Sequence, residues 1–416
     1  MKSEILTANE KSINKLKTAQ PFWVNVEPAN KVLGIDKHTL LHAGPPIVWK
    51  DMCGPMRGAV IAALKYEGLA EDDEEALTLA GSGKINFEPC HHHNAVGPMT
   101  GITSYSMPMI CVENKENGNF SYNTFNEGAG DVLRFGAYGE NTVRRLKWIE
   151  NTLAPAMKKT VLEMGGVNLK VLIAQSLTRG DELHMRNNAS SDVFIKTIIG
   201  TLVKTASDSS ALCEITDFLT KNNDQFFLNF AMAANKSAAD AAHGIPYSTI
   251  VTAIARNGVE IGIRVSGLGD QWFTAPAEMV KGMYFTGYKP EDANPDIGDS
   301  AIMETGGLGG FAIASAPAIV RVLGAGTYRD AVNYTMDMYE ISDSECEQYA
   351  IPNLDFRGTP IGINIIKVVE TGITPIINTA IAGKEAGIGM IGAGISKAPV
   401  KMFEQALFSF ASQYGL

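Results

Sequence analysis

Three consecutive histidines form the tract best suited to chemistry, because they stand beside a carboxylate and a thiol in Glu88-Pro89-Cys90-His91-His92-His93-Asn94. Histidines clustered with such groups are typical of metal ligation or acid–base catalysis. The preceding residues predict a short strand, and neighbouring side chains on a strand point to opposite faces, so only His91 and His93 would converge on one ion. The alternative is that these rings only hydrogen-bond within a tight turn. We expect a functional role for at least one histidine and no tight metal site.

A glycine-rich turn that follows a strand is the second candidate, Arg264-Val265-Ser266-Gly267-Leu268-Gly269-Asp270. Apolar and other residues alternate along 259–265, which places Arg264 on the face opposite the apolar side chains. Backbone N–H groups at Ser266, Gly267 and Gly269 would bind an anion together with the forked guanidinium. A plain loop after a hairpin strand explains the pattern equally well.

Carboxylates precede a second glycine-rich segment, Gly306-Gly307-Leu308-Gly309-Gly310. Asp296, Asp299 and Glu304 would bind a cation or orient a ligand there, or equally cap a following helix. Arg186-Asn187-Asn188 is a polar segment. It lies either at the edge of a binding site or in a buried network whose polar groups are all hydrogen-bonded.

The spelling Gly387-x-Gly389-x-x-Gly392-x-Gly394 matches the dinucleotide-binding pattern, but its context does not. The preceding Gly383-Lys384-Glu385-Ala386 is not an apolar strand, and no complete βαβ unit can follow. We predict no Rossmann-type nucleotide and assign no other cofactor.

Composition and charge argue against a nucleic-acid-binding, disulfide-rich or membrane protein. A chain of 416 residues with a formal net charge of −10 lacks the basic surface that nucleic acids require. The five cysteines are scattered and never form Cys-x-x-Cys, which favours a reducing compartment over a disulfide framework. The longest uncharged run, 305–320, is too short to cross a bilayer, and the N-terminus lacks the apolar core of a secretory signal. We expect a cytoplasmic protein with no membrane partner.

Changes in residue spacing predict a mixed α+β fold. Turn signals at Asn117-Gly118 and Asn257-Gly258 each separate two strand-like runs, which predicts antiparallel hairpins and argues against one parallel sheet. Helical spacing dominates between them. We therefore predict an α/β lobe at 1–129, a helical lobe at 130–221, and a glycine-rich α/β lobe at 222–416.

Tracts along nearly the whole chain resemble the YlbE-like family, long a domain of unknown function. In the family's order they are Leu41-His42-Ala43-Gly44-Pro45-Pro46, Gly54-Pro55-Met56, Pro89-Cys90-His91-His92, Asn94-Ala95-Val96-Gly97-Pro98-Met99, Arg134-Phe135-Gly136-Ala137-Tyr138-Gly139, Asp224-Gln225-Phe226-Phe227-Leu228-Asn229, Gly262-Ile263-Arg264-Val265-Ser266-Gly267-Leu268-Gly269, Asn294-Pro295-Asp296, Gly298-Asp299-Ser300-Ala301 and Glu370-Thr371-Gly372-Ile373-Thr374-Pro375. A relative in this family has valine at the position of His93, so the resemblance favours His91 and His92.

The resemblance implies a subunit of a multi-subunit oxamate carbamoyltransferase of anaerobic allantoin breakdown. That enzyme converts oxalurate and phosphate to oxamate and carbamoyl phosphate. Its other parts would be a succinyl-CoA-synthetase-like subunit and a third subunit, and this chain could also form homo-oligomers. A non-catalytic structural subunit of the same complex is one alternative. An independent metal-dependent hydrolase that uses the His91–His93 tract is another.

The chemistry of carbamoyl transfer assigns roles to the candidate residues. It requires a phosphate site, donors for a developing oxyanion and a general acid for the departing nitrogen. We expect His91, His92 and Arg264 to be catalytic. We also predict that the three segments line one cleft. Residues at the strand ends and turns of these segments are expected to bind the substrate, namely Asn94, Ser266, Gly267, Gly269 and Asp299.

Overall fold

The first sheet is antiparallel and has the strand order β5-β4-β1-β6 in the computed structural model, which describes residues 2–221, 223–324 and 326–415. Its strands are β1 (Pro21–Pro28), β4 (Pro108–Asn114), β5 (Asn119–Thr124) and β6 (Val167–Asn168). The pairing of β4 with β5 around Asn117-Gly118 confirms the first predicted hairpin. Helix α10 (Leu228–Ala241) packs along β5, β4 and β1.

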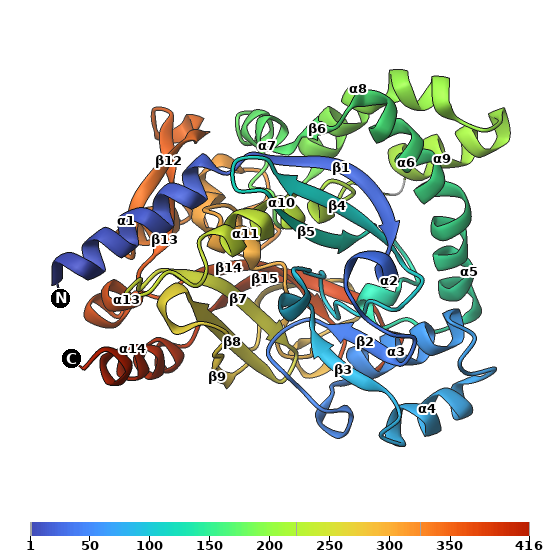
Figure 1. Ribbon diagram of the computed structural model, residues 1–416, viewed down its shortest axis with the longest axis horizontal. Coiled ribbons are helices and arrows are strands. Elements are labelled where there is room, and N and C mark those ends of the chain that lie inside the picture. Colours follow the sequence, from blue (N-terminus) through green and yellow to red (C-terminus); the bar gives the residue numbers. More distant parts are fainter. Residues whose placement is uncertain (1, 222, 325, 416) are drawn as a thin grey trace.

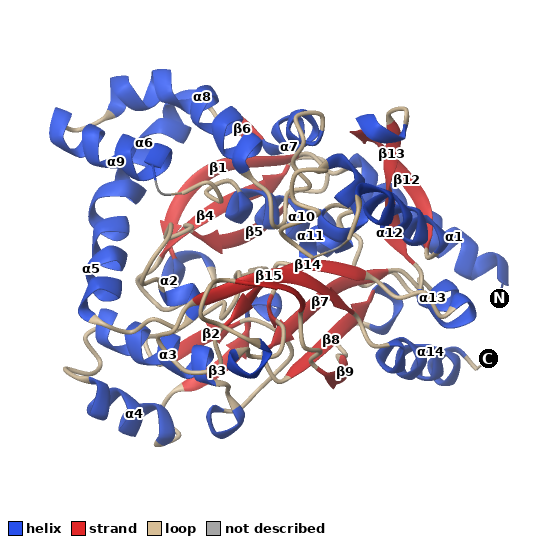
Figure 2. Cartoon of the chain, turned by 180° about the vertical axis from the view of Figure 1, so that it is seen from behind, coloured by secondary structure: helices blue, strands red, loops and turns tan. Residues whose placement is uncertain are grey.

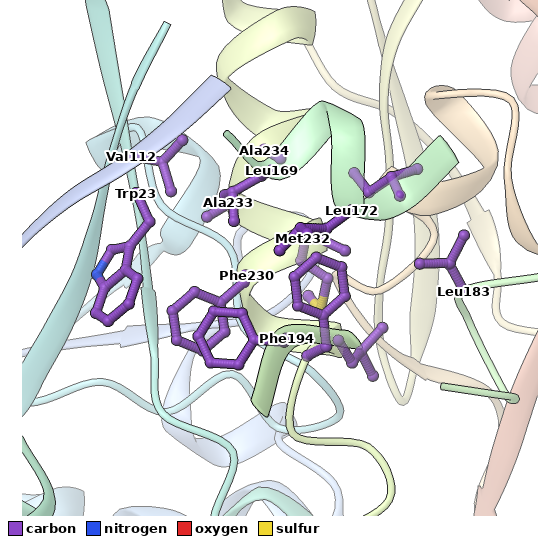
Figure 3. Close-up of a cluster of buried hydrophobic side chains, with 14 of the residues drawn as sticks. Trp23, Val112, Leu169, Leu172, Leu183, Phe194, Phe230, Met232, Ala233 and Ala234 are labelled. Atoms are coloured by element: carbon purple, nitrogen blue, oxygen red, sulfur yellow. The ribbon is translucent and has the colours of Figure 1, made fainter. Parts of the chain in front are cut away.

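A cluster of large aromatic side chains holds helices to this sheet. Trp23 of β1 meets Phe230 of α10 edge-on, with 5.1 Å between ring centroids, and Phe194 lies 4.5 Å from Phe230 (Figure 3). All three side chains are fully buried. Aromatic groups of this size bury large areas, so they supply much of the stabilisation of this core.

Helices follow one another from residue 140 to 221, as their spacing predicts. They are α5 (Glu140–Trp148), α6 (Ala154–Met164), α7 (Leu169–Leu177), α8 (Asn188–Thr205) and α9 (Ser209–Lys221), with a π-helical turn at Ile149–Leu153 between α5 and α6. The hydrophobic cluster around Trp23 also includes residues from α6 to α10 and from the C-terminal part of the chain, such as Ile361. The three-lobe division stays a prediction.

Two further antiparallel sheets come from the C-terminal part of the chain. One has the order β11-β7-β8-β9 and consists of β7 (Val251–Asn257), β8 (Glu260–Val265), β9 (Phe273–Pro276) and β11 (Ile297–Gly298). The other has the order β10-β15-β14 and consists of β10 (Lys281–Tyr284), β14 (Ile376–Ala382) and β15 (Met390–Lys397). The β7–β8 pair confirms the hairpin at Asn257-Gly258, and this mixture of small sheets and helices confirms an α+β fold.

The glycine spelling at 387–394 belongs to this last sheet. Gly392 and Gly394 lie in β15, where an added Cβ would come within 2.3 Å of the Met283 carbonyl oxygen and 2.4 Å of that of Lys281, respectively. These glycines therefore let β10 approach β15. An antiparallel ladder at this point is not the strand–turn–helix that a dinucleotide motif needs.

Two short two-stranded sheets and several helices complete the chain. β2 (Thr39–His42) pairs with β3 (Asn86–Pro89) in parallel, and α3 (Gly54–Tyr66) and α4 (Asp73–Gly81) form the crossover between them. β12 (Ser342–Ile351) pairs with β13 (Arg357–Ile363). The remaining helices are α1 (Lys2–Thr18), α2 (Ala29–Val32), α11 (Ile302–Thr305), α12 (Tyr328–Glu340), α13 (Ile365–Thr371) and α14 (Val400–Tyr414). No helix in the described ranges is both long and apolar enough to cross a membrane.

The layers place α10 at the centre of the molecule. In both views α10 and α11 lie between the β1–β4–β5 sheet and strands β7, β14 and β15 (Figures 1 and 2). The ends of the chain marked N and C lie on the same side (Figure 1). A polar side chain on α10 is thus surrounded by protein unless it borders a cavity.

Candidate active site

The histidine tract forms a 3₁₀ turn, Cys90–His93, directly after β3. Asn94 closes the turn in the left-handed conformation with φ 54°, and its backbone N–H bonds to the Cys90 carbonyl. Successive side chains on such a turn are about 120° apart. His91 and His92 therefore border one cavity, whereas His93 turns away to Glu88 Oε2, at 2.6 Å, and the Leu33 carbonyl, at 2.9 Å. His91 and His93 could converge only on a strand, and here the strand ends at Pro89.

The cavity beside the histidine turn has a volume of about 330 Å³, and every residue that lines it is polar or charged. Three segments contribute to it: the histidine turn, the end of α10 with the residues after it, and β8 with the residues after it. It is lined by His91, His92, Asn94, Asp240, His243, Arg264 and Asp270. We call it the histidine cavity. It unites His91, His92, Asn94 and Arg264 of the predicted set.

Arg264 is held at the cavity wall by its place on β8. Its neighbours Ile263 and Val265 are fully buried, so the guanidinium lies on the other side of the strand. Nη2 donates to Asp270 and, at 3.0 Å, to His243 Nε2, while Nη1 reaches the His91 carbonyl at 3.4 Å. The Arg264 Nε–H is buried and has no hydrogen-bond partner.

Lys236 adds a second buried cation from α10. Its side chain is 1% exposed, and Nζ lies 2.5 Å from Asp240 Oδ1 and 3.3 Å from the same His91 carbonyl. Burial lowers the pKa of Lys236, while the Asp240 carboxylate opposes that shift. Two buried cations thus converge on the carbonyl of His91, next to the cavity, although Lys236 itself is not part of the lining. This concentration of positive charge favours an anion.

His92 and His243 are neutral because partial burial and nearby positive charge disfavour their protonation. Burial, followed by the charge of Arg264, lowers the pKa of His92 and lowers that of His243 to about 4. The hydrogen bonds agree, because Arg264 and Trp272 can only donate. His243 Nε2 accepts from Arg264, and His92 Nε2 accepts from Trp272 Nε1 at 2.9 Å, so both rings carry their proton on Nδ1.

His91 is the residue of the cavity lining in which both side-chain nitrogens are buried without hydrogen-bond partners. The residue is 2% exposed. Burial, then the charges of Lys236 and Arg264, lowers its pKa far below the ordinary value. A buried polar atom without a partner costs about 1–3 kcal/mol, so such atoms often mark places that a ligand completes.

Asp299 lies behind His91 rather than in the cavity lining. Its Oδ1 is 3.7 Å from His91 Nε2, and its carboxylate accepts the N–H groups of Gly44 at 2.8 Å and Gly97 at 3.0 Å. Burial raises the pKa of Asp299 to about 7. An added Cβ on Gly44 would come within 2.5 Å of the Asn257 nitrogen, so the backbones after β2 and at the end of β7 are in direct contact. Asp299 therefore fixes backbone around His91.

The turn after β8 does not deliver its backbone to the cavity. Ser266 Oγ donates to the Ala242 carbonyl at 2.6 Å, and the Gly267 carbonyl accepts from Tyr414 of α14 at 2.7 Å. Gly269 has φ 59° and no atom within 4 Å of an added Cβ. None of the three borders the histidine cavity. Within the described ranges, no group of three or more His, Cys, Asp or Glu side chains is placed to hold a metal ion.

The other acidic candidates form buried pairs. Arg256 donates to both oxygens of Asp296, at 3.0 and 3.1 Å. Glu304 Oε1 lies 2.7 Å from His184 Nδ1 and accepts the N–H of Gly310 at 3.0 Å. The second glycine-rich segment thus belongs to a hydrogen-bonded network, whereas the polar segment at Arg186 leaves the buried Asn187 Oδ1 without a partner.

Lys236, Asp240, His243 and Trp272 are site residues that sequence reasoning missed. The available signal was the pair Lys236 and Asp240, four residues apart within a segment rich in alanine and other small residues. Isolated charges on a helix that is otherwise apolar are rarely buried without a polar partner.

Comparisons with known proteins place the chain in a family. A family model described as "Oxamate carbamoyltransferase subunit AllG" matches residues 85–300, a range that includes the histidine turn, α10 and β8. The chain is 48% identical over 419 residues to "Oxamate carbamoyltransferase subunit AllG" of Escherichia coli (strain K12), with 100% of both chains covered. It is 46% identical over 414 residues to "Uncharacterized protein YahG" of the same organism, covering 99% of this chain and 87% of that protein.

A solved structure has the same fold. It is described as a conserved protein of unknown function from Enterococcus faecalis V583, with a TM-score of 0.96, 45% identity, and 98% of both chains covered. The YlbE-like label stays a prediction. Identity of this level over the full length is decisive, and the chain belongs to the family of oxamate carbamoyltransferase subunit AllG.

Proposed function

We propose that this chain is a subunit of an oxamate carbamoyltransferase and that its histidine cavity holds the phosphate or carbamoyl phosphate group. The observation that carries the proposal is the pair of buried cations, Arg264 and Lys236, beside a histidine whose ring nitrogens both lack partners. A phosphate dianion would supply acceptors for these donors and offset the cost of their burial.

The proposed reaction is transfer of the carbamoyl group of oxalurate to phosphate. A phosphate oxygen attacks the carbamoyl carbon, the bond from that carbon to the oxamate nitrogen breaks, and carbamoyl phosphate and oxamate leave. The proton lost by hydrogenphosphate balances the proton gained by the oxamate nitrogen. Arg264 and Lys236 would stabilise the developing negative charge.

A neutral histidine suits the proton transfer that this reaction needs. His91 would accept the phosphate proton on one ring nitrogen and return it from that same nitrogen to the departing nitrogen. His92 would position the substrate from the rim, with its Nε2 held by Trp272 and its Nδ1–H available as a donor. Asn94, which also borders the cavity, would contribute a further polar contact to the substrate.

Partner subunits form part of the proposal. The chain would act in the cytoplasm with a succinyl-CoA-synthetase-like subunit and a third subunit, in anaerobic breakdown of allantoin. The alternative within the complex is a structural role without chemistry. It predicts that changes in the histidine cavity leave turnover intact.

Phosphate-dependent formation of carbamoyl phosphate from oxalurate, with and without the two partner subunits, tests the proposal directly. Arg264→Gln should lower turnover by about a hundred-fold, because one charge-assisted donor to the transition state is lost. The exposed Arg144→Gln on α5 is the matched control and should leave turnover unchanged. Full activity of an Arg264→Gln complex that assembles normally would rule out catalysis in this cavity.

A further inference from the structure

We propose that a second cleft, built around Arg134, binds a small monocarboxylate that also carries an amide N–H. The cleft has a volume of about 580 Å³, and its lining includes Arg134, Asn223, Gln225, Phe285, Ile388 and Met390. It shares no lining residue with the histidine cavity. The inference does not depend on the proposed function, because binding to the chain alone tests it.

Arg134 is the side chain that points to a ligand. It is 8% exposed, and its Nη1 is buried without a hydrogen-bond partner. The nearby Glu127 attracts it electrostatically, but the Glu127 oxygens accept the backbone N–H groups of Leu133, at 2.5 Å, and Arg134, at 3.1 Å. Burial lowers the pKa of Arg134 to about 10, so the guanidinium stays charged at neutral pH. A buried cation with an open donor favours an anion.

A smaller cavity of about 20 Å³ shares Arg134, Phe135 and Gln225 with the cleft. Arg134 and Gln225 are therefore polar groups that border both spaces. Phe285, Ile388 and Met390 add apolar surface to the lining of the cleft.

The distribution of charge selects the class of ligand. Arg134 is the buried cation, whereas the other charged lining residues, Asp131, Lys221 and Asp224, are exposed. One buried guanidinium matches a single carboxylate, which it can bind with two parallel N–H donors.

Amide side chains supply the second half of the recognition. Asn223 Nδ2 donates to the Asn126 carbonyl at 3.1 Å, and Gln225 Nε2 donates to the Met185 carbonyl at 3.3 Å. With both nitrogens used in this way, the side-chain oxygens are the atoms that can accept an N–H from a ligand. A carboxylate next to an amide fits this set.

Titration calorimetry of the full chain with oxamate tests the inference. Oxamate carries both groups, and its neutral diamide, oxamide, lacks the carboxylate. We expect oxamate to bind at least ten-fold more tightly than oxamide, and Arg134→Gln to weaken oxamate binding by at least ten-fold. Equal affinity for the two compounds, or no binding of oxamate to the unaltered chain, would overturn the inference.

A variant at the cleft entrance covers the case in which the buried Arg134→Gln chain does not fold. Ile388 is 38% exposed, so Ile388→Glu should fold and should weaken oxamate binding by several-fold through charge repulsion. Phe408→Glu is the matched control, because Phe408 is 78% exposed on α14 and borders neither cavity. If Arg264→Gln abolishes binding and Ile388→Glu does not, oxamate occupies the histidine cavity and the Arg134 site is wrong.

Discussion

Two buried histidines beside carboxylates behave differently in this chain. His184 Nδ1 lies 2.7 Å from Glu304 Oε1, and that oxygen also accepts backbone N–H groups from Gly310 and Asn378. His91 Nε2 lies 3.7 Å from Asp299 Oδ1, which is too long for a hydrogen bond, and both of its nitrogens lack partners. Residue type alone does not separate the two pairs.

The difference lies in what satisfies each carboxylate and each ring. The Glu304 pair is complete within the fold, so its contribution is stability. Asp299 accepts the backbone N–H groups of Gly44 and Gly97, whereas the ring nitrogens of His91, a residue that borders the histidine cavity, have no partners. An incomplete histidine next to buried cations points to a ligand, and a complete one points to structure.

The largest effect on stability is expected from breaking the His184–Glu304 pair. Glu304→Ala should lower the free energy of unfolding by about 3–5 kcal/mol, because it leaves His184 and two backbone donors buried without their acceptor. Urea unfolding followed by circular dichroism measures this. Asp337→Ala, an exposed acid on α12, is the control and should change stability by less than about 0.5 kcal/mol. A similarly small loss for Glu304→Ala would remove the distinction between the two pairs.

Replacing His91, which lies beside Asp299, should not destabilise the chain. His91→Phe keeps an aromatic ring against Trp272 but removes two buried nitrogens that have no hydrogen-bond partner. The free energy of unfolding should therefore be unchanged or higher by about 1 kcal/mol. Turnover of the assembled complex should fall by at least about a hundred-fold, since the proposed proton carrier is gone. His184→Phe, measured beside it, should instead destabilise the chain. A destabilised His91→Phe chain with normal turnover would reverse the assignment.

Anion binding in the histidine cavity should strengthen as pH falls. Without ligand, the pKa of His92 lies below 6.5 and that of His243 is about 4. A bound anion raises both values, so the complex takes up protons and its affinity increases with decreasing pH. Sulfate is the suitable probe because its charge is constant between pH 7.5 and 5.5. Calorimetry should show tighter sulfate binding at the lower pH, and His243→Gln should reduce the difference. Affinity independent of pH would show that no histidine titrates with binding.

The smallest effect concerns a competing carboxylate. Asp270 is 86% exposed and already occupies the Arg264 guanidinium. Asp270→Asn should therefore tighten sulfate binding by a few-fold, while Glu404→Gln, an exposed change on α14, should not. Weaker binding after Asp270→Asn would mean that Asp270 holds Arg264 in its binding position instead of competing with the anion.

Short-range signals predicted much of this architecture. Asn117-Gly118 and Asn257-Gly258 define their hairpins through local turn chemistry, and the alternation along β8 places Arg264 opposite the apolar side chains. The interrupted helical spacing of residues 132–219 predicts the helices between these sheets. Local patterns of this kind depend only on neighbours in sequence, so the structure they predict does not require knowledge of distant contacts.

The composition of the histidine cavity depended on contacts that no local pattern encodes. Lys236 reaches the His91 carbonyl across 145 residues of chain, and Arg264 does so across 173. The backbone N–H groups of Ser266 and Gly267 donate to the carbonyls of Ile250 and Ser248, and these residues do not border the histidine cavity. The direction of the histidine side chains depended on where β3 ends, and strand boundaries are poorly specified by sequence.

The N-terminal helix α1 has a consequence for how the chain is made. Asn9 Nδ2 bonds to Thr249 Oγ1, 240 residues later, and Ser12 Oγ bonds to Ser248 Oγ at 2.7 Å. At the usual rates of protein synthesis, α1 waits about 10–50 s after its own synthesis before these partners exist. Its inner face, with Ile13 and Leu16, is open to solvent or to chaperones during that time, so the burial of α1 is a late event in the folding of each new chain.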